Sequence, residues 1–104
     1  MHLDNYLHHW QRFVDEFNIS TEELPRRNKL FAEVCEYDEA VRLSTKEHAD
    51  DEALDVLITA IALVQSRGIH EPLHACAMKL DRSAERYRKQ GGYDGCKQTT
   101  ARPD

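Results

Sequence analysis

The sequence predicts an all-α protein built from four helices, and three observations support that class. Apolar residues recur at intervals of three and four along nearly the whole chain, which places them on one face of a helix. Proline and glycine occur where helices are expected to begin and end, at Pro25, Gly68, Pro72, Gly91 and Gly92. No stretch shows the alternation of apolar and polar residues that is typical of a β-strand.

The first two helices are expected over residues 3–17 and from about Pro25 to about residue 43. The apolar face of the first helix steps by four, three, four and three residues: Leu3, Leu7, Trp10, Val14 and Phe17. The sequence NISTEELP then interrupts this pattern. Pro25 suits the first turn of the second helix, because a proline in the middle would remove a backbone hydrogen bond. The second helix has its own apolar side: Leu30, Val34, Tyr37 and Val41.

The third helix is expected to begin at Ser44, which stands three residues before Glu47 with the spacing of a capping box. Gly68 is the natural place for this helix to end. Pro72 suits the start of the fourth helix, and the glycine pair at 91–92 ends it. The apolar face of the fourth helix is expected to consist of Leu73, Ala77, Leu80, Ala84 and Tyr87.

Length and composition indicate one domain over residues 1–90, followed by a small, polar and mobile tail over residues 91–104. A chain of 104 residues has a modest core, so an oligomer that buries more surface is expected. The formal net charge of −5 argues against a general nucleic-acid binder, which needs a basic surface to neutralise phosphates.

Cysteine usage and hydropathy indicate a cytoplasmic protein. The three cysteines form no C-x-x-C pair and are odd in number, so a reducing compartment is the simplest interpretation. Cys35 is expected to be a small buried residue. The N-terminal MHLDNYLHHW is amphipathic, unlike a signal peptide. The longest apolar run, about twelve residues, is too short for a membrane helix, which needs about 20.

Acidic residues interrupt the most apolar part of the third helix. Ten of the twelve residues at 53–64 are apolar, and the exceptions are Asp55 and Thr59. On a helical wheel these two share a narrow stripe with Glu52, while the rest of the circumference is apolar. A helix that is apolar nearly all round is expected to be buried. A carboxylate on it is costly unless it is paired, protonated or bound to a cation.

The second helix carries a matching pair of carboxylates. Glu33 and Glu36 are three residues apart and lie beside the apolar face. A short connection makes the second and third helices antiparallel neighbours, so these two side chains should converge with Glu52 and Asp55. Four carboxylates at one site raise one another's pKa, and a divalent cation removes that cost. Oxygen ligands suit Mg²⁺ or Mn²⁺ rather than Zn²⁺. Solvated charges on two helix faces are the simpler alternative.

The acidic pattern resembles that of the MazG-like proteins, members of the all-α nucleoside triphosphate pyrophosphatase superfamily. Their metal motif is E-x-x-E, a gap, and then E-x-x-D, which here is EVCE at 33–36, fifteen intervening residues and EALD at 52–55. The stretches KLFAEVCEYDEA, DEALDVLITAIALVQSRGI and KLDRSAERY are also similar to family segments. The resemblance covers residues 29–87, and Ser83 stands where many relatives have asparagine.

This resemblance implies a four-helix, MazG-like bundle that hydrolyses nucleoside triphosphates, with deoxynucleotides favoured. Glu33, Glu36, Glu52 and Asp55 would hold one to three Mg²⁺ ions, with Mn²⁺ as a possible substitute. Water attacks the α-phosphorus, pyrophosphate leaves, and a nucleoside monophosphate remains. Glu36 and Glu52 are the expected catalytic carboxylates, Glu36 being the candidate for orienting the water. The family assembles as dimers or as dimers of dimers, so a homodimer or homotetramer is expected.

Two further groups of residues are candidates for substrate binding. Lys79, Arg82 and Arg86 lie on one stripe of the fourth helix, where cations could hold the β- and γ-phosphates. Lys79 and Arg86 also match the family pattern, although a solvated basic face is the simpler alternative. Trp10 could contact the base, but it also continues the apolar face of the first helix and could pack in the core.

Other interpretations of the sequence are weaker. HEPLH at 70–74 has the form of a zinc-peptidase motif, but Pro72 makes this segment a helix start rather than a helix interior. A di-iron site would need two E-x-x-H pairs and two further glutamates, and one such pair is present. The alternative function is a non-catalytic helical interaction module with a degenerate metal site.

Overall fold

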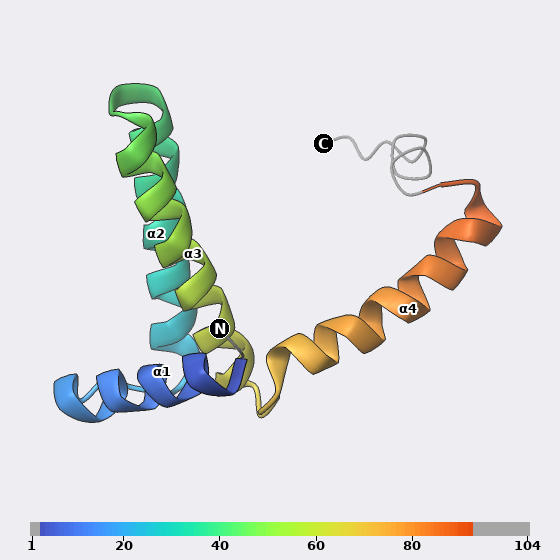
Figure 1. Cartoon of the computed structure of the whole chain (residues 1–104), viewed down its shortest axis with the longest axis horizontal. Coiled ribbons are helices and arrows are strands. Elements are labelled where there is room, and N and C mark those ends of the chain that lie inside the picture. Colours follow the sequence, from blue (N-terminus) through green and yellow to red (C-terminus); the bar gives the residue numbers. More distant parts are fainter. Residues whose placement is uncertain (1–2, 93–104) are drawn as a thin grey trace. The chain divides into compact units, whose positions relative to one another are not determined.

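The structure is a computed structural model and describes residues 3–92. Within this range it contains no strand and four helices (Figure 1): α1, Leu3–Phe17; α2, Glu23–Leu43; α3, Lys46–Ser66; and α4, Pro72–Gln90. The predicted all-α class is confirmed. The chain divides into two units, Met1–Pro72 and Leu73–Asp104. The expectation of one domain over 1–90 stays a prediction, and most of the predicted tail lies outside the described residues.

Helices α2 and α3 form an antiparallel hairpin (Figure 1). Two residues, Ser44 and Thr45, connect them, as the predicted short connection requires. The buried apolar side chains of this hairpin are mostly small, because Ala40, Ala49 and Ala62 are all at most 9% exposed. Small side chains let two helices approach closely. Longer side chains at the edges of the contact, such as glutamates, can therefore reach across from one helix to the other.

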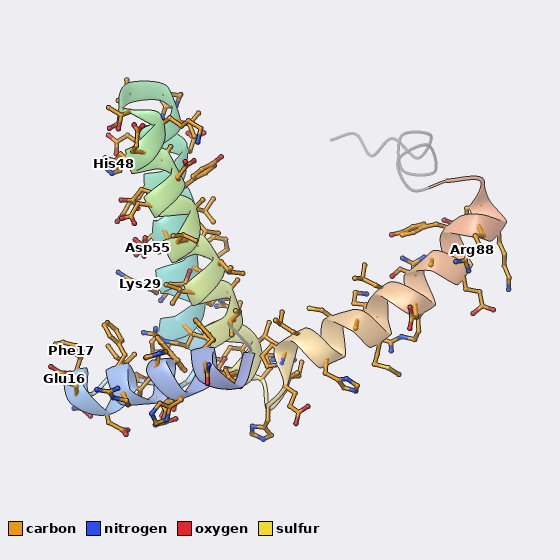
Figure 2. All side chains as sticks on the ribbon, viewed as in Figure 1. Glu16, Phe17, Lys29, His48, Asp55 and Arg88 are labelled. Atoms are coloured by element: carbon orange, nitrogen blue, oxygen red, sulfur yellow. The ribbon has the colours of Figure 1, made fainter. Side chains whose placement is uncertain are left out.

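Helix α1 lies across the open end of the hairpin (Figure 1). Val14 is buried, as its place on the predicted apolar face requires. Three aromatic rings follow one another along α1, with centroids 6.0 Å apart for Trp10 and Phe13 and 4.8 Å apart for Phe13 and Phe17. Phe17 was expected on the buried face of α1, but this residue, at the end of the helix, is 56% exposed (Figure 2).

The helix ends follow the predicted signals with one correction. Pro25 lies in the first turn of α2 and Gly68 follows α3 with a positive φ of 89°, a conformation that glycine adopts readily. The cap of α3, however, is Thr45 rather than Ser44: the Thr45 side chain accepts a hydrogen bond from the His48 N–H at 3.1 Å. Ser44 instead ends α2, and its N–H donates to the Ala40 carbonyl.

Removing this cap should lower stability measurably. Thr45→Ala leaves a backbone N–H in the first turn of α3 without its acceptor, so the free energy of unfolding should fall by about 1 kcal/mol. Urea titration followed by circular dichroism measures this change. Ser44→Ala is the matched control and should cost less than about 0.5 kcal/mol. A larger loss for Ser44→Ala than for Thr45→Ala would place the cap at Ser44 after all.

Several large apolar side chains of the hairpin remain exposed. On α3, Leu54 is 57% and Leu57 is 54% exposed, although a helix apolar nearly all round was expected to be buried. The reason is that, among the helices of the described residues, α2 alone makes extensive contacts with α3. On α2, Phe31 is 64% exposed. The prediction that Cys35 is buried is wrong, since this residue is exposed on the side of α2 turned away from Glu33. Such apolar surface commonly marks an interaction site.

Helix α4 begins at Pro72, so HEPLH is a helix start, as predicted. None of the helices in the described part of the chain combines the length and the apolarity that crossing a bilayer demands.

Candidate metal centre

Three carboxylates from α2 and α3 meet at one place in the hairpin. Glu33, Glu36 and Glu52 each contribute a carboxylate oxygen, and these oxygens lie within 4.8 Å of one another. Glu33 and Glu36 are neighbours because residues three apart share one face of a helix, and the antiparallel partner brings Glu52 opposite them. The structure therefore brings together three of the four predicted ligands.

Each of the two less exposed glutamates has one oxygen paired and one oxygen without a partner. Glu33 is 5% exposed, and its Oε2 accepts from Lys29 Nζ at 3.0 Å. Glu52 Oε2 lies 3.1 Å from His48 Nε2. Glu33 Oε1 and Glu52 Oε1 are buried and have no hydrogen-bond partner. A buried oxygen without a donor is costly, and a bound cation would remove this cost.

Asp55, the fourth predicted ligand, lies outside the group of three. It lies on α3 three residues after Glu52, on the same side of the hairpin as Lys29 (Figure 2). Burial raises the pKa of Asp55, and the charges of Glu33 and Glu52 raise it further. Asp55 therefore experiences the field of the cluster without belonging to its closest set of oxygens.

The cluster also perturbs two groups on α2. The charge of Glu33 raises the pKa of Glu36, with desolvation and the charge of Glu52 as smaller causes. The hydrogen bond to Glu33 raises the pKa of Lys29. Both shifts have the sign expected for a site that carries excess negative charge: protons and cations are attracted to it.

Acidification should stabilise the metal-free protein. The pKa values of Glu36 and Asp55 are raised. At pH values just above the ordinary pKa of a carboxyl group, the folded state therefore binds more protons than the unfolded state. The free energy of unfolding then falls as the pH rises from about 4 into the neutral range. Thermal melts in EDTA measure this slope, and Asp55→Asn should flatten it. A melting temperature that rises throughout this interval would contradict the assignment.

A pocket of about 410 Å³ extends from the acidic residues to the aromatic residues of α1. Glu33 and Asp55 line one part of it, and Trp10 and Phe13 line another. Basic residues and small or apolar side chains complete the wall: Arg26, Lys29, Ile19, Ile58 and Thr59. Thr59 is held in place because its hydroxyl donates to the carbonyls of residues 55 and 56 on its own helix.

Trp10 has features of a core residue and of a residue that lines a binding pocket. It is half-buried, as a core residue would be, and it also lines this pocket. Arg26 lies in the same wall, and its Nε is buried without a hydrogen-bond partner. The pocket thus combines acidic, basic and aromatic side chains, which could contact a metal ion, phosphate groups and a base respectively.

The predicted phosphate-binding cations lie on α4, in the other unit of the chain. Lys79, Arg82 and Arg86 are exposed. The guanidinium of Arg86 lies 4.7 Å from the centre of the Tyr87 ring, and its Nη2 donates to the Tyr87 hydroxyl at 2.9 Å. A meeting of these cations with the acidic cluster stays a prediction.

Comparison with known proteins assigns no family to this chain. The chain matches no protein-family model, no curated protein and no solved structure. The MazG-like family therefore stays a prediction that depends on the sequence motifs.

Proposed function

We propose that this protein is a Mg²⁺-dependent nucleoside triphosphate pyrophosphohydrolase, which converts a nucleoside triphosphate and water to a nucleoside monophosphate and pyrophosphate. The observation that supports this most directly is the acidic cluster itself. Three carboxylates lie within 4.8 Å of one another, and two of their oxygens are buried without a hydrogen-bond partner. Such an arrangement is unfavourable for a protein that binds no cation.

The donor atoms suit a hard divalent cation. All of them are carboxylate oxygens, which Mg²⁺ and Mn²⁺ prefer and which do not favour zinc. Glu33, Glu36 and Glu52 would hold the metal, with Asp55 completing the set. When bound, the metal cancels negative charge on phosphate oxygens and lowers the pKa of a coordinated water.

Side chains of the pocket and other polar side chains of the protein have chemistry that fits a nucleotide. Lys29 and Arg26 line the same pocket as Glu33 and can donate to phosphate oxygens. Trp10 and Phe13 offer ring faces on which a base can stack. Glu36 is exposed and its pKa is raised, which suits a group that accepts a proton from the attacking water. Lys79, Arg82 and Arg86 of α4, which are exposed, are the further cations that we propose for phosphate binding.

A nucleotide panel tests the proposal. The protein is incubated with each deoxynucleoside and ribonucleoside triphosphate and Mg²⁺, and pyrophosphate and orthophosphate are measured separately. We expect pyrophosphate release, with deoxynucleotides favoured, and its loss in Glu52→Gln and Asp55→Asn. Asp38→Asn is the matched control, because it removes an exposed carboxylate of α2 that pairs with the exposed Arg42.

The exposed apolar surface of the hairpin supports a homo-oligomer as part of this proposal. Phe31, Leu54 and Leu57 are each more than half exposed, and a homodimer or homotetramer would cover such side chains. The same surface favours the alternative function, a helical interaction module. Absence of pyrophosphate release from every nucleotide, together with no Mg²⁺-induced rise in melting temperature, would favour the module.

A further inference from the structure

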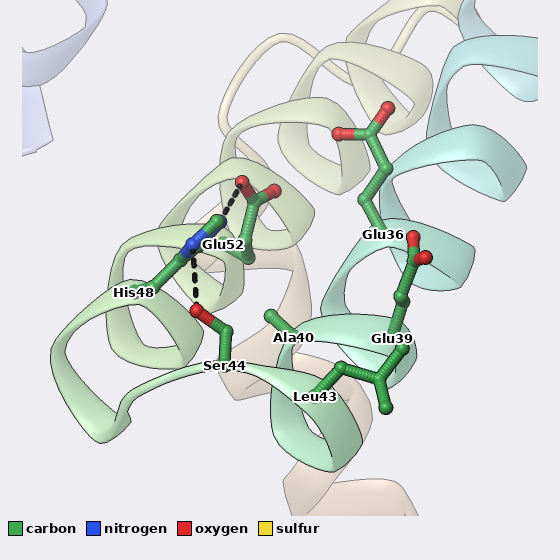
Figure 3. Close-up of a pocket in the computed structure, with 7 residues that line it drawn as sticks. All are labelled: Glu36, Glu39, Ala40, Leu43, Ser44, His48 and Glu52. Atoms are coloured by element: carbon green, nitrogen blue, oxygen red, sulfur yellow. Dashed lines mark hydrogen bonds and ion pairs between the residues drawn. The ribbon is translucent and has the colours of Figure 1, made fainter.

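His48 joins the connection between α2 and α3 to the acidic cluster. Its Nδ1 lies 3.1 Å from Ser44 Oγ and its Nε2 lies 3.1 Å from Glu52 Oε2. Figure 3 shows these two contacts on one wall of a pocket of about 340 Å³, with Glu36 on the α2 side of the same space. The metal-ligand motif does not include His48.

The arrangement follows from spacing along the chain. Ser44, His48 and Glu52 are each four residues apart, so His48 and Glu52 lie on one face of α3. Ser44 stands just before this helix, in extended backbone, and its hydroxyl contacts His48 Nδ1. A two-residue connection thus supplies the third member of the chain of hydrogen bonds.

The chemistry of the three groups fixes the direction of the hydrogen bonds. A carboxylate can only accept, so His48 Nε2–H is the donor to Glu52 Oε2. In the tautomer of the imidazole that carries its single proton on Nε2, Nδ1 accepts from the Ser44 hydroxyl. This leaves Glu52 Oε1, which is buried and has no hydrogen-bond partner, as the oxygen available to a cation.

We propose that His48 is a positioning residue for Glu52: it holds Oε2 and thereby presents Oε1 to the metal, while Ser44 orients the imidazole. This inference depends on the proposed function, because it assigns a purpose to Glu52 as a metal ligand. A second oxygen of the cluster also lacks a hydrogen-bond partner, since Glu33 is 5% exposed and its Oε1 has none. His48 itself contacts no metal in this proposal.

The test measures Mg²⁺ affinity in the full chain without nucleotide, from the Mg²⁺ concentration that gives half of the maximal rise in melting temperature. His48→Ala should raise this concentration about tenfold, because outer-sphere partners of metal ligands commonly contribute 10–100-fold to affinity. His48→Gln places an amide N–H where Nε2–H was and should restore most of the loss. Ser44→Ala should have a smaller effect of the same sign.

Lys46→Ala is the matched control. Lys46 Nζ and Asp50 Oδ2 form an exposed pair of the same spacing in the first turn of the same helix, 2.6 Å apart. Losing this ion pair changes the start of α3 but removes no contact of the three carboxylates. Mg²⁺ affinity should therefore stay at the wild-type value. Pyrophosphate release provides a second measurement: in His48→Ala the Mg²⁺ requirement should rise about tenfold, while the rate at saturating Mg²⁺ stays within about threefold of wild type.

The outcomes separate this inference from the proposed function. If the wild-type protein shows no response to Mg²⁺, the proposed function fails, and the inference fails with it. If the wild-type protein binds Mg²⁺, Glu52→Gln does not, and His48→Ala binds as the wild type does, the positioning role alone is overturned. Equal losses in His48→Ala and Lys46→Ala would also overturn it, because they would reflect helix stability.

Discussion

Replacing Glu33 by glutamine should abolish the response to Mg²⁺ without destabilising the metal-free protein. Glu33 is 5% exposed, and its charge is the main cause of the raised pKa of Glu36. Glutamine keeps the shape of the side chain and an oxygen that can accept from Lys29, but it removes the negative charge. The melting temperature in EDTA should therefore equal or exceed that of the wild type. The Mg²⁺-induced rise should disappear.

The same substitution should lower pyrophosphate release at least about 100-fold, because even outer-sphere partners of a metal ligand contribute 10–100-fold. Asp38→Asn controls for the change in net charge on α2 and should leave both measurements unaltered. Melting curves with and without Mg²⁺ decide the first part, and a coupled pyrophosphate assay decides the second. A Glu33→Gln protein that melts well below the wild type in EDTA would indicate that the carboxylate stabilises the fold through Lys29.

Shortening Ile61 should produce the largest loss of stability among simple substitutions. Ile61 is the largest apolar side chain that is buried in the described part of the chain, at 8% exposure. Ile61→Ala removes packed methyl groups and leaves a cavity, which costs about 2–5 kcal/mol. For a domain of this size the melting temperature should then fall by roughly 10 °C or more. Such a loss is a large fraction of the 5–15 kcal/mol typical of a folded domain.

A graded pair of variants makes this prediction specific. Ile61→Val deletes one methylene and should cost about 0.5–1.5 kcal/mol, so the two losses should be clearly ordered in urea titrations. Mg²⁺ affinity should change little in Ile61→Val, because Ile61 does not line the pockets beside the carboxylates. A cost below about 1 kcal/mol for Ile61→Ala would mean that this end of α3 is not packed as described.

Helix type and helix ends could be predicted because they depend on local signals. Pro25 and Gly68 act through their own backbone restrictions, and both lie where such residues belong. The cap of α3 was misplaced by one residue because Ser44 and Thr45 both carry a hydroxyl, and the choice between them depends on where α2 ends. The exposure of Leu54 and Leu57 could not be predicted either. A helical wheel shows that a residue is apolar but not whether another helix covers it.

The candidate site was predictable to the extent that it depends on helical periodicity. The i, i+3 spacing of Glu33 and Glu36 and the short connection predict that Glu52 meets them, but they do not predict that Asp55 lies outside the closest set of oxygens. The contacts of Lys29 and His48 with the cluster were missed, although the signal was present: each stands four residues before a glutamate that it contacts. Phe13 had no such signal, since its place in the pocket depends on how α1 crosses the hairpin.

The two-residue connection at Ser44 and Thr45 also limits how this protein can vary through insertion and deletion. One added residue that extended α3 at its beginning would turn the rest of that helix by about 100° relative to its partner. Glu52 would then leave the cluster, although no carboxylate had been replaced. The five residues at 18–22 between α1 and α2 lie outside the hairpin, so a change of length there leaves the three carboxylates in register. Descendants of this chain should therefore tolerate a change of length at 18–22 more readily than at 44–45.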